Sequence, residues 1–196
     1  MSNTNQNTAM MREIIGDSIS NINTALPAVV VSYDSGTNKA VVKPVGAMKF
    51  PDNRSLPYPD IHEVPVIFPT SMGGACGVTF PIHPGDGCLL VFSQADISYF
   101  TEKGIDSGNS FQLTDAIAIP GLYNAPPKGM AEHSNVLTLF YNNSYLTMSD
   151  AGIRARMADG TSLSLGGGEL IVDGISLNKH VHGGVMPGGG NTGLPK

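Results

Sequence analysis

The sequence predicts an all-β protein with one N-terminal helix, a small barrel, and a narrow shaft built from very short strands. Three observations predict this fold class. Short runs of β-branched and aliphatic residues recur between turn signals. The chain contains 24 glycines and 14 prolines, and only 14% of its residues are charged. At 196 residues it is long enough for one compact domain plus a smaller module.

Charge and hydropathy exclude two classes of partner or placement. Eleven Lys and Arg against sixteen Asp and Glu give a net charge of −5, so we expect no nucleic-acid partner. No run approaches the ~18 consecutive apolar residues of a membrane span, and the N-terminus lacks a basic region followed by an apolar one. We therefore expect a protein made in the cytoplasm without a Sec-type signal. In that compartment Cys76 and Cys88 are expected as two buried free thiols.

Residues 1–26 predict an amphipathic helix that Pro27 ends. Its apolar positions recur at spacings of three and four, at Met11, Ile14, Ile15, Ile19, Ile22 and Leu26. A helix with one apolar stripe needs a surface to cover that stripe. Either its own domain or a partner or sister chain can provide one.

Residues 27–123 change to short β runs, which indicate a barrel like that of oligonucleotide/oligosaccharide-binding (OB) domains. The first two strands meet at a turn over 34–38. Further strands are expected at EVPVIFP, GVTFPI, CLLVFS and DAIAI, with a short helix or loop at DISYFTEKG. Nothing in this stretch resembles catalytic machinery.

Residues 124–135 predict a linker, because adjacent prolines and a glycine disfavour both helix and central strand. Residues 136–177 then alternate between an apolar face and a face of mostly Ser, Thr or Arg. Strands this short cannot enclose a core in one chain. We therefore expect three chains to form an intertwined trimeric β-helix or β-prism; a hairpin sheet packed on the barrel is the alternative. The apolar positions are Leu137 and Leu139, Leu146 and Met148, Ile153, Ala155 and Met157, Leu163 and Leu165, Leu170 and Val172, and Ile175 and Leu177.

The tip, residues 178–196, carries the candidate metal ligands His180 and His182. Two apart on an extended strand, they project on the same side. One pair is an incomplete site, but three chains on an axis would supply six nitrogens in an octahedral cage, which allows Fe(II), Co(II) or Ni(II). Chance surface histidines, or part of a mononuclear enzyme centre with open positions, are the alternatives.

The same residues carry a resemblance to a known family. The run DGISL before HVHGG, and V-x-PGGG-x-TG-x-P after it, resembles the C-terminal tip of membrane-piercing spike proteins from contractile-tailed bacteriophages and related R-type bacteriocins. The stretches IHPGDGCLLVFSQADISYF and TDAIAIPGLYN resemble the N-terminal OB domain of that family. The resemblance covers most of the chain from about Ala28 onward.

This resemblance implies a homotrimeric needle at the tip of a tail baseplate, capped by one Fe(II) per trimer that His180 and His182 of three chains hold. It implies a virion structural protein, without catalysis or a small-molecule substrate, that sheath contraction drives through the host outer membrane into the periplasm. We expect the helix and barrel end to face the baseplate hub or tail tube protein. Some relatives carry a lysozyme domain between barrel and prism, where this chain has only the linker. A type VI secretion-like spike and an OB-fold carbohydrate-binding module are the alternatives.

Overall fold

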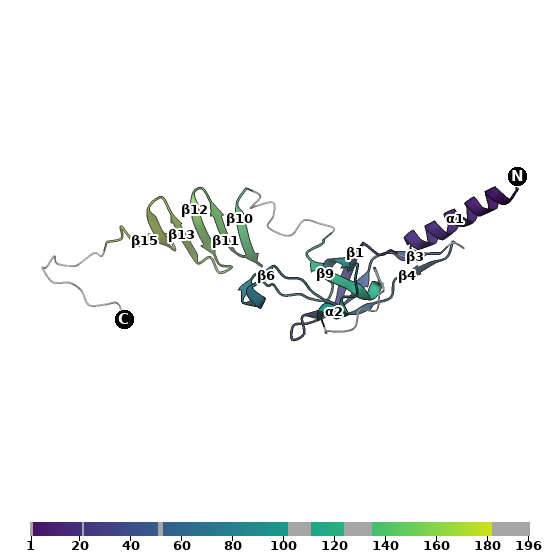
Figure 1. Cartoon of the computed structure of the whole chain (residues 1–196). Coiled ribbons are helices and arrows are strands. Elements are labelled where there is room, and N and C mark those ends of the chain that lie inside the picture. The colour runs from purple at the N-terminus through teal and green to yellow at the C-terminus, as the bar shows by residue number, and fades with distance from the viewer. Residues whose placement is uncertain (1, 21, 51–52, 102–110, 124–134, 182–196) are drawn as a thin grey trace. The chain divides into compact units, whose positions relative to one another are not determined.

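The structure is a computed structural model that describes residues 2–20, 22–50, 53–101, 111–123 and 135–181. The chain divides into two compact units, Met1–Ala125 and Pro126–Lys196, each described here by itself (Figure 1). Both are built mainly of β-strands, so the predicted all-β class is confirmed. The expected linker lies outside the described residues, apart from Asn135. Among the described helices, none is long and apolar enough to cross a membrane.

The first unit begins with the helix α1 (Ser2–Ser20), and its described residues hold nine strands. Three further helical elements lie among these residues: the short helix α2 (Ser98–Thr101) and single 3-10 turns at Met72–Gly74 and Leu113–Asp115. The strands are β1 (Ala25–Asp34), β2 (Lys39–Pro44), β3 (Ala47–Lys49), β4 (Ser55–Pro57), β5 (Ile61–Pro65), β6 (Thr70–Ser71), β7 (Cys76–Gly77), β8 (Gly87–Phe92) and β9 (Ala116–Pro120).

Five of these strands form a small barrel. They are ordered β5-β2-β1-β8-β9, and all neighbours are antiparallel. A parallel bridge between Val66 and Ala118 brings the two outer strands together, and the Ile67 amide donates to the Ala118 carbonyl at 2.9 Å. A five-stranded, partly open antiparallel barrel is the OB-like architecture predicted from the sequence.

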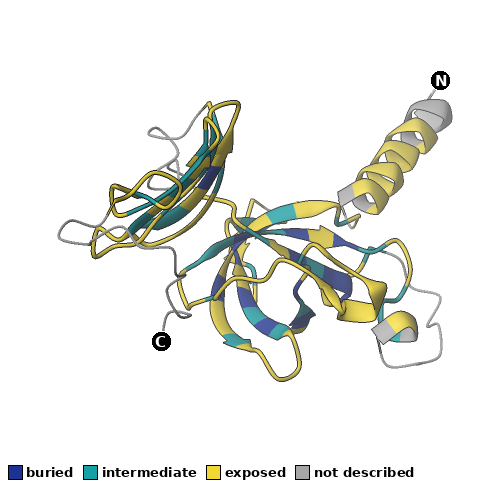
Figure 2. Cartoon of the chain, turned by 90° about the vertical axis from the view of Figure 1, so that its left-hand side faces the viewer, coloured by how far each residue is buried: buried dark blue, intermediate teal, exposed yellow. Residues whose placement is uncertain are grey.

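Alternate side chains of the barrel strands fill its interior, because successive residues of a strand point to opposite faces (Figure 2). Burial raises the pKa of the Cys88 thiol to about 11, so this group packs as a neutral side chain. Cys76 is predicted to be buried too, but it is exposed on the two-residue strand β7, which among the described strands pairs with β6 alone. The buried core is Ala28, Val30, Ala40, Val42, Ile61, Val64, Val66, Cys88, Leu90, Phe92, Ala116 and Ala118.

The helix is shorter than the sequence predicts. It ends at Ser20, and Leu26 and Pro27 belong instead to β1, where they pair with Leu90 and Leu89 of β8. Leu26 packs partly buried against the barrel core in this position, so pairing and burial replace the last predicted helical turn. The apolar side chains of α1 are exposed, so the barrel does not cover them (Figure 2).

The expected strand GVTFPI is also absent as such. Only Gly77 takes part in strand pairing, and the following residues run as irregular chain. Pro81 has no amide hydrogen for a ladder. The segment is held through its side chains instead: Phe80 meets Phe68 edge to face at 5.0 Å, and Ile82 packs partly buried on the core.

The second unit is a six-stranded antiparallel meander in which each strand pairs with the next. Positive φ angles at Asn142, Gly160 and Gly174 mark tight turns between strands, which suit asparagine and glycine. The pairing thus runs within one chain; the intertwining of three chains stays a prediction. The strands are β10 (Leu137–Tyr141), β11 (Ser144–Ser149), β12 (Gly152–Arg156), β13 (Ser162–Gly166), β14 (Glu169–Val172) and β15 (Ile175–Ser176).

Candidate functional sites: the shaft, its tip and a barrel groove

The register of the second unit places the predicted apolar residues of its strands on one face. Residues directly opposite one another on paired strands share a face. One row across the sheet is Leu137, Met148, Ile153, Leu165 and Leu170. The next row is Leu139, Leu146, Ala155, Leu163, Val172 and Ile175. These two rows are called the apolar face below.

The opposite face is mostly polar, as predicted. Its rows hold Thr138, Thr147, Arg154 and Ser164, and alongside them Arg156 and Ser162. Phe140, Tyr145 and Ile171 interrupt the polar pattern. Both arginines are exposed, while Thr147 is buried and its hydroxyl donates to the Arg154 carbonyl at 3.4 Å. The two faces of this sheet therefore differ sharply in character.

Among the described residues of the second unit, nothing covers the apolar face. Leu137 is 63% exposed and Leu165 50% exposed, and Thr147 is the one buried residue among those described in the second unit. Apolar surface left in water costs about 25 cal/mol per Å² relative to burial. A continuous exposed apolar patch on a sheet marks an interaction surface. The sheet therefore needs another protein surface against this face.

At the end of the shaft, two side-chain contacts attach the start of the tip to the sheet. Asn178 Nδ2 donates to the Gly168 carbonyl at 3.0 Å, and Lys179 forms an ion pair with Glu169 of β14. The contacts join residues just after β15 to the turn before β14 and to the first residue of β14. The chain therefore reaches His180 in a fixed direction.

His180 is exposed and is held by the backbone of β15. Its amide donates to the Ser176 carbonyl at 3.0 Å, and its Nδ1 lies 3.1 Å from the same oxygen. With the proton on Nδ1, the lone pair resides on Nε2, the form in which histidine binds metals. A carbonyl on the other ring nitrogen is the usual support of a metal-bound histidine.

His182, the second predicted ligand, lies outside the described residues. Within the described part of the chain, no three His, Cys, Asp or Glu side chains are grouped closely enough to hold a metal ion. His180 therefore fits an iron site as one imidazole donor, and the remaining donors have to come from elsewhere.

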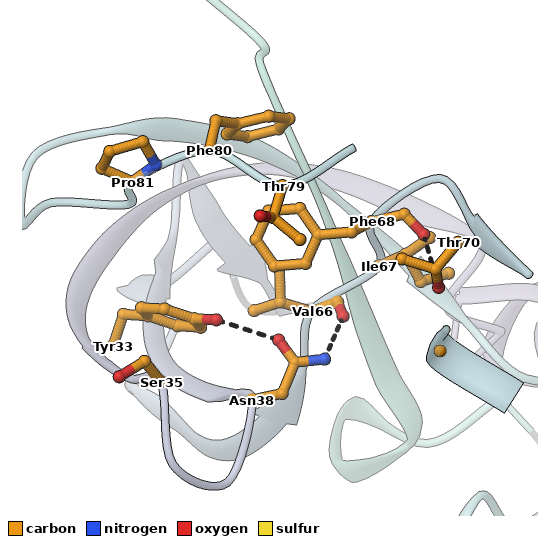
Figure 3. A pocket seen from close by; sticks show the side chains of 11 residues that line it. Tyr33, Ser35, Asn38, Val66, Ile67, Phe68, Thr70, Thr79, Phe80 and Pro81 are labelled. Atoms are coloured by element: carbon orange, nitrogen blue, oxygen red, sulfur yellow. Dashed lines mark hydrogen bonds between the residues drawn. The ribbon is translucent and has the colours of Figure 1, made fainter. Parts of the chain in front are cut away.

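A groove of about 830 Å³ opens on the barrel between the β1–β2 turn and the chain after β5 (Figure 3). Aromatic rings of Tyr33, Phe68 and Phe80 line it, together with Thr79 and Pro81 among others. The sequence analysis missed this groove, because its walls come from segments far apart in the chain. The only signal that the sequence holds for it is a pair of Phe-Pro dipeptides, at 68–69 and 80–81.

The groove has a fixed wall and no ionisable lining residue apart from the Tyr33 phenol. The Tyr33 hydroxyl donates to Asn38 Oδ1 at 3.0 Å, and Asn38 Nδ2 donates to the Val66 carbonyl at 2.9 Å (Figure 3). These bonds use both ends of the Asn38 amide. The lining offers neither a nucleophile with an adjacent base nor a carboxylate pair, so its chemistry suits binding rather than catalysis.

Comparison with known proteins gives two family matches. Residues 26–121 match the phage protein Gp138 N-terminal domain, and residues 174–196 match the GpV apex motif. No match was found among curated protein sequences. The first match covers the barrel from β1 through β9; the second begins at the turn before β15 and includes His180 and His182. Both matched domains are those of the phage baseplate spike proteins, so the chain belongs to this family.

Proposed function

We propose that this chain forms the homotrimeric central spike of a contractile phage tail or tailocin, which pierces the host outer membrane when the sheath contracts. The observation that carries the proposal is the uncovered apolar face, in a chain whose two ends match a baseplate domain and a spike apex. Three copies of the shaft would bury that face around one axis. The polar face, with Arg154 and Arg156, would then face outward.

The dimensions of the strands suit three chains. A strand of five residues spans about 16 Å at roughly 3.3 Å per residue. The centre of each side of a triangular prism with that edge lies about 5 Å from the axis, half the ~10 Å at which two sheets normally stack. Leucine, isoleucine, valine and methionine side chains fill such a distance. A prism this narrow has no lumen, which suits a stiff needle.

In this proposal the protein acts mechanically in the virion and has no enzymatic role. The N-terminal end joins the baseplate hub or tail tube protein, and the apex leads through the outer membrane into the periplasm. The membrane is thus a transient partner. A type VI secretion-like spike remains the alternative. The identity of the hub protein that the chain joins would distinguish it from a phage-tail spike.

We further propose that His180 and His182 of three chains hold one Fe(II) per trimer at the tip. Support comes from the backbone contact that orients the His180 ring and from the apex match over both residues. The bound ion would supply a cross-link between chains. With six imidazoles around it, no coordination position would be left for substrate or activated water.

Tail particles that carry an altered spike test the piercing role. Particles assembled with a chain lacking residues 174–196 should adsorb to cells as the wild type does. They should admit far less of a chromogenic β-lactam to a periplasmic β-lactamase, because the blunt shaft cannot open the outer membrane. Equal substrate entry with truncated and full-length spikes would contradict the proposal.

A second candidate function, carbohydrate binding, is favoured by the groove alone. Aromatic rings and hydroxyl groups without charge suit an uncharged sugar, and OB barrels bind oligosaccharides near the loop between their first two strands. Binding on a glycan array tests this function. Phe80→Ala should abolish the binding, whereas Phe100→Ala, which changes an exposed residue outside the groove, should preserve it. If no glycan binds to the wild-type protein, carbohydrate binding is ruled out.

A further inference from the structure

The helix α1 carries an apolar stripe that the barrel does not cover. The stripe consists of Met11, Ile14, Ile15 and Ile19 of α1 and continues at Ile22 beyond the helix end. Met11 is 67% exposed, Ile15 56% and Ile19 63%. Most residues of α1 are weak helix formers such as Ser, Thr, Asn and Ile, so the helix is only marginally stable in water by itself. Its apolar side therefore needs a partner, as the apolar face of the shaft does.

The stripe is wide. Met11 and Ile15 are four residues apart, as in a coiled-coil repeat, and Ile14 and Ile19 lie on either side of the line that they form. An apolar arc that includes flanking positions is broader than the seam of a two-helix coil and suits contact with more than one helix. Of the charged residues, Glu13 lies on the opposite side of the helix, and Arg12 lies at the edge of the stripe, seven residues before Ile19.

Ser18 is a polar residue within the stripe, and its hydroxyl is already hydrogen-bonded. Its hydroxyl donates to the Ile14 carbonyl at 2.8 Å, one helical turn back. A hydroxyl bonded to its own helix can enter an apolar interior without the cost of an unsatisfied donor. Ser18 therefore does not prevent burial of the stripe.

We propose that the α1 helices of three chains pack into a parallel three-helix bundle, so that the sister helices cover each stripe. This inference rests on the proposed trimer. Only residues 21–24 separate α1 from β1, a stretch that spans at most about 14 Å, so a trimer holds three helices on one particle, each near the start of its own β1. Contact between the helices is then an intramolecular step, which lets helices that are marginal alone associate.

Disulfide cross-linking in the full chain tests the bundle, with exposed Cys76 replaced by serine and buried Cys88 kept. Ile15→Cys places a thiol inside the stripe, and Glu13→Cys places one on the opposite side of the same turns. In a bundle, one disulfide can form between two of the three chains. Under mild oxidation this disulfide should form at least tenfold faster in the Ile15→Cys variant than in the matched Glu13→Cys variant. Equal rates, in a sample with the mass of a trimer, would overturn the bundle and leave the trimer standing. A monomeric mass would instead overturn the proposed function.

Circular dichroism supplies a second readout that needs no cysteine. The double variant Ile15→Asn, Ile19→Asn should lose the helical signal of α1 from the isolated trimer, and Glu13→Gln should keep it. If the wild-type helix forms only when the trimer joins particles that carry the hub, then the hub protein covers the stripe. That result would overturn the bundle.

Discussion

At the scale of single residues, two glycines allow β12 and β13 to approach each other. Gly152 and Gly166 flank the first cross-strand pair, Ile153 with Leu165. A Cβ on Gly152 would lie 2.1 Å from the Leu165 carbonyl oxygen, and one on Gly166 would lie 2.2 Å from the Ala151 oxygen. Gly152 also has a φ of +124°, which other residues rarely adopt. The short shaft strands therefore depend on glycine at this corner.

Gly152→Ala should destabilise the shaft by roughly 2 kcal/mol or more, since backbone has to move to relieve the overlap. Gly167→Asn is the matched control: its φ is +61°, there is open space beside it, and asparagine adopts this conformation. Denaturant unfolding compares the two variants with the wild type. Equal losses for both would show that the close approach at Gly152 is unimportant.

The β1–β2 turn gives a pH-dependent contribution to stability. Asp34 Oδ1 accepts the Gly36 amide at 2.8 Å and Oδ2 accepts the Thr37 hydroxyl at 2.9 Å, and these bonds lower the pKa of Asp34. The stabilisation is present above the ordinary pKa of 3.8 and is lost as pH falls through the lower folded value. Asp34→Ala should therefore lower unfolding free energy at pH 6 but progressively less below pH ~4. A difference that is the same at pH 6 and pH 2 would contradict this account.

At the scale of elements, the two faces of β13 allow a matched test of the shaft. Leu165 lies on the apolar face, and its neighbour Ser164 lies on the polar face opposite Arg154. In a trimer, Leu165→Asp would place three carboxylates near the axis, at a cost of several kcal/mol per ion. It should abolish the trimer, whereas Ser164→Asp should leave the trimer mass unchanged in light scattering. Tolerance of Leu165→Asp would mean that the apolar face is not buried between chains.

The elements that the sequence predicts well are those whose pattern is local. Apolar and polar residues alternate in the short runs between Leu137 and Leu177, and turn residues separate these runs. This pattern predicts each strand of the shaft and the face on which each of its residues lies. The predicted end of the N-terminal helix is wrong by six residues. Leu26 and Pro27 pair instead with the strand β8, which lies over sixty residues away in the sequence. The exposure of Cys76 was missed for a related reason: nothing local shows that its strand has only one neighbour.

The candidate sites were predictable to different degrees. His180 stands out by its spacing from His182, although the Ser176 carbonyl that orients its ring needed the structure. The barrel groove could not be predicted, since Tyr33 and Phe80 meet only through the fold. The β3–β4 hairpin was also missed, because its three-residue strands are too short to show alternation.

At the scale of the whole molecule, the tip and the shaft should be separable. His180→Ala with His182→Ala should remove bound iron, which the proposal sets at one third of an ion per chain. The trimer should persist, because the apolar face does not depend on metal. Elemental analysis of protein purified without chelator measures the iron, with His62→Ala, an exposed barrel histidine, as the control. Unchanged iron in the double variant would place the ion elsewhere.

The mass of the intact protein in solution tests the central claim most directly. Three observations favour three copies of the chain around one axis: the uncovered apolar face, the short strands of the shaft and the exposed stripe of α1. Multi-angle light scattering of the wild type should therefore give three times the 20.5 kDa of a single chain, independent of concentration in the micromolar range. A mass of 20.5 kDa, or of twice that value, would contradict the account.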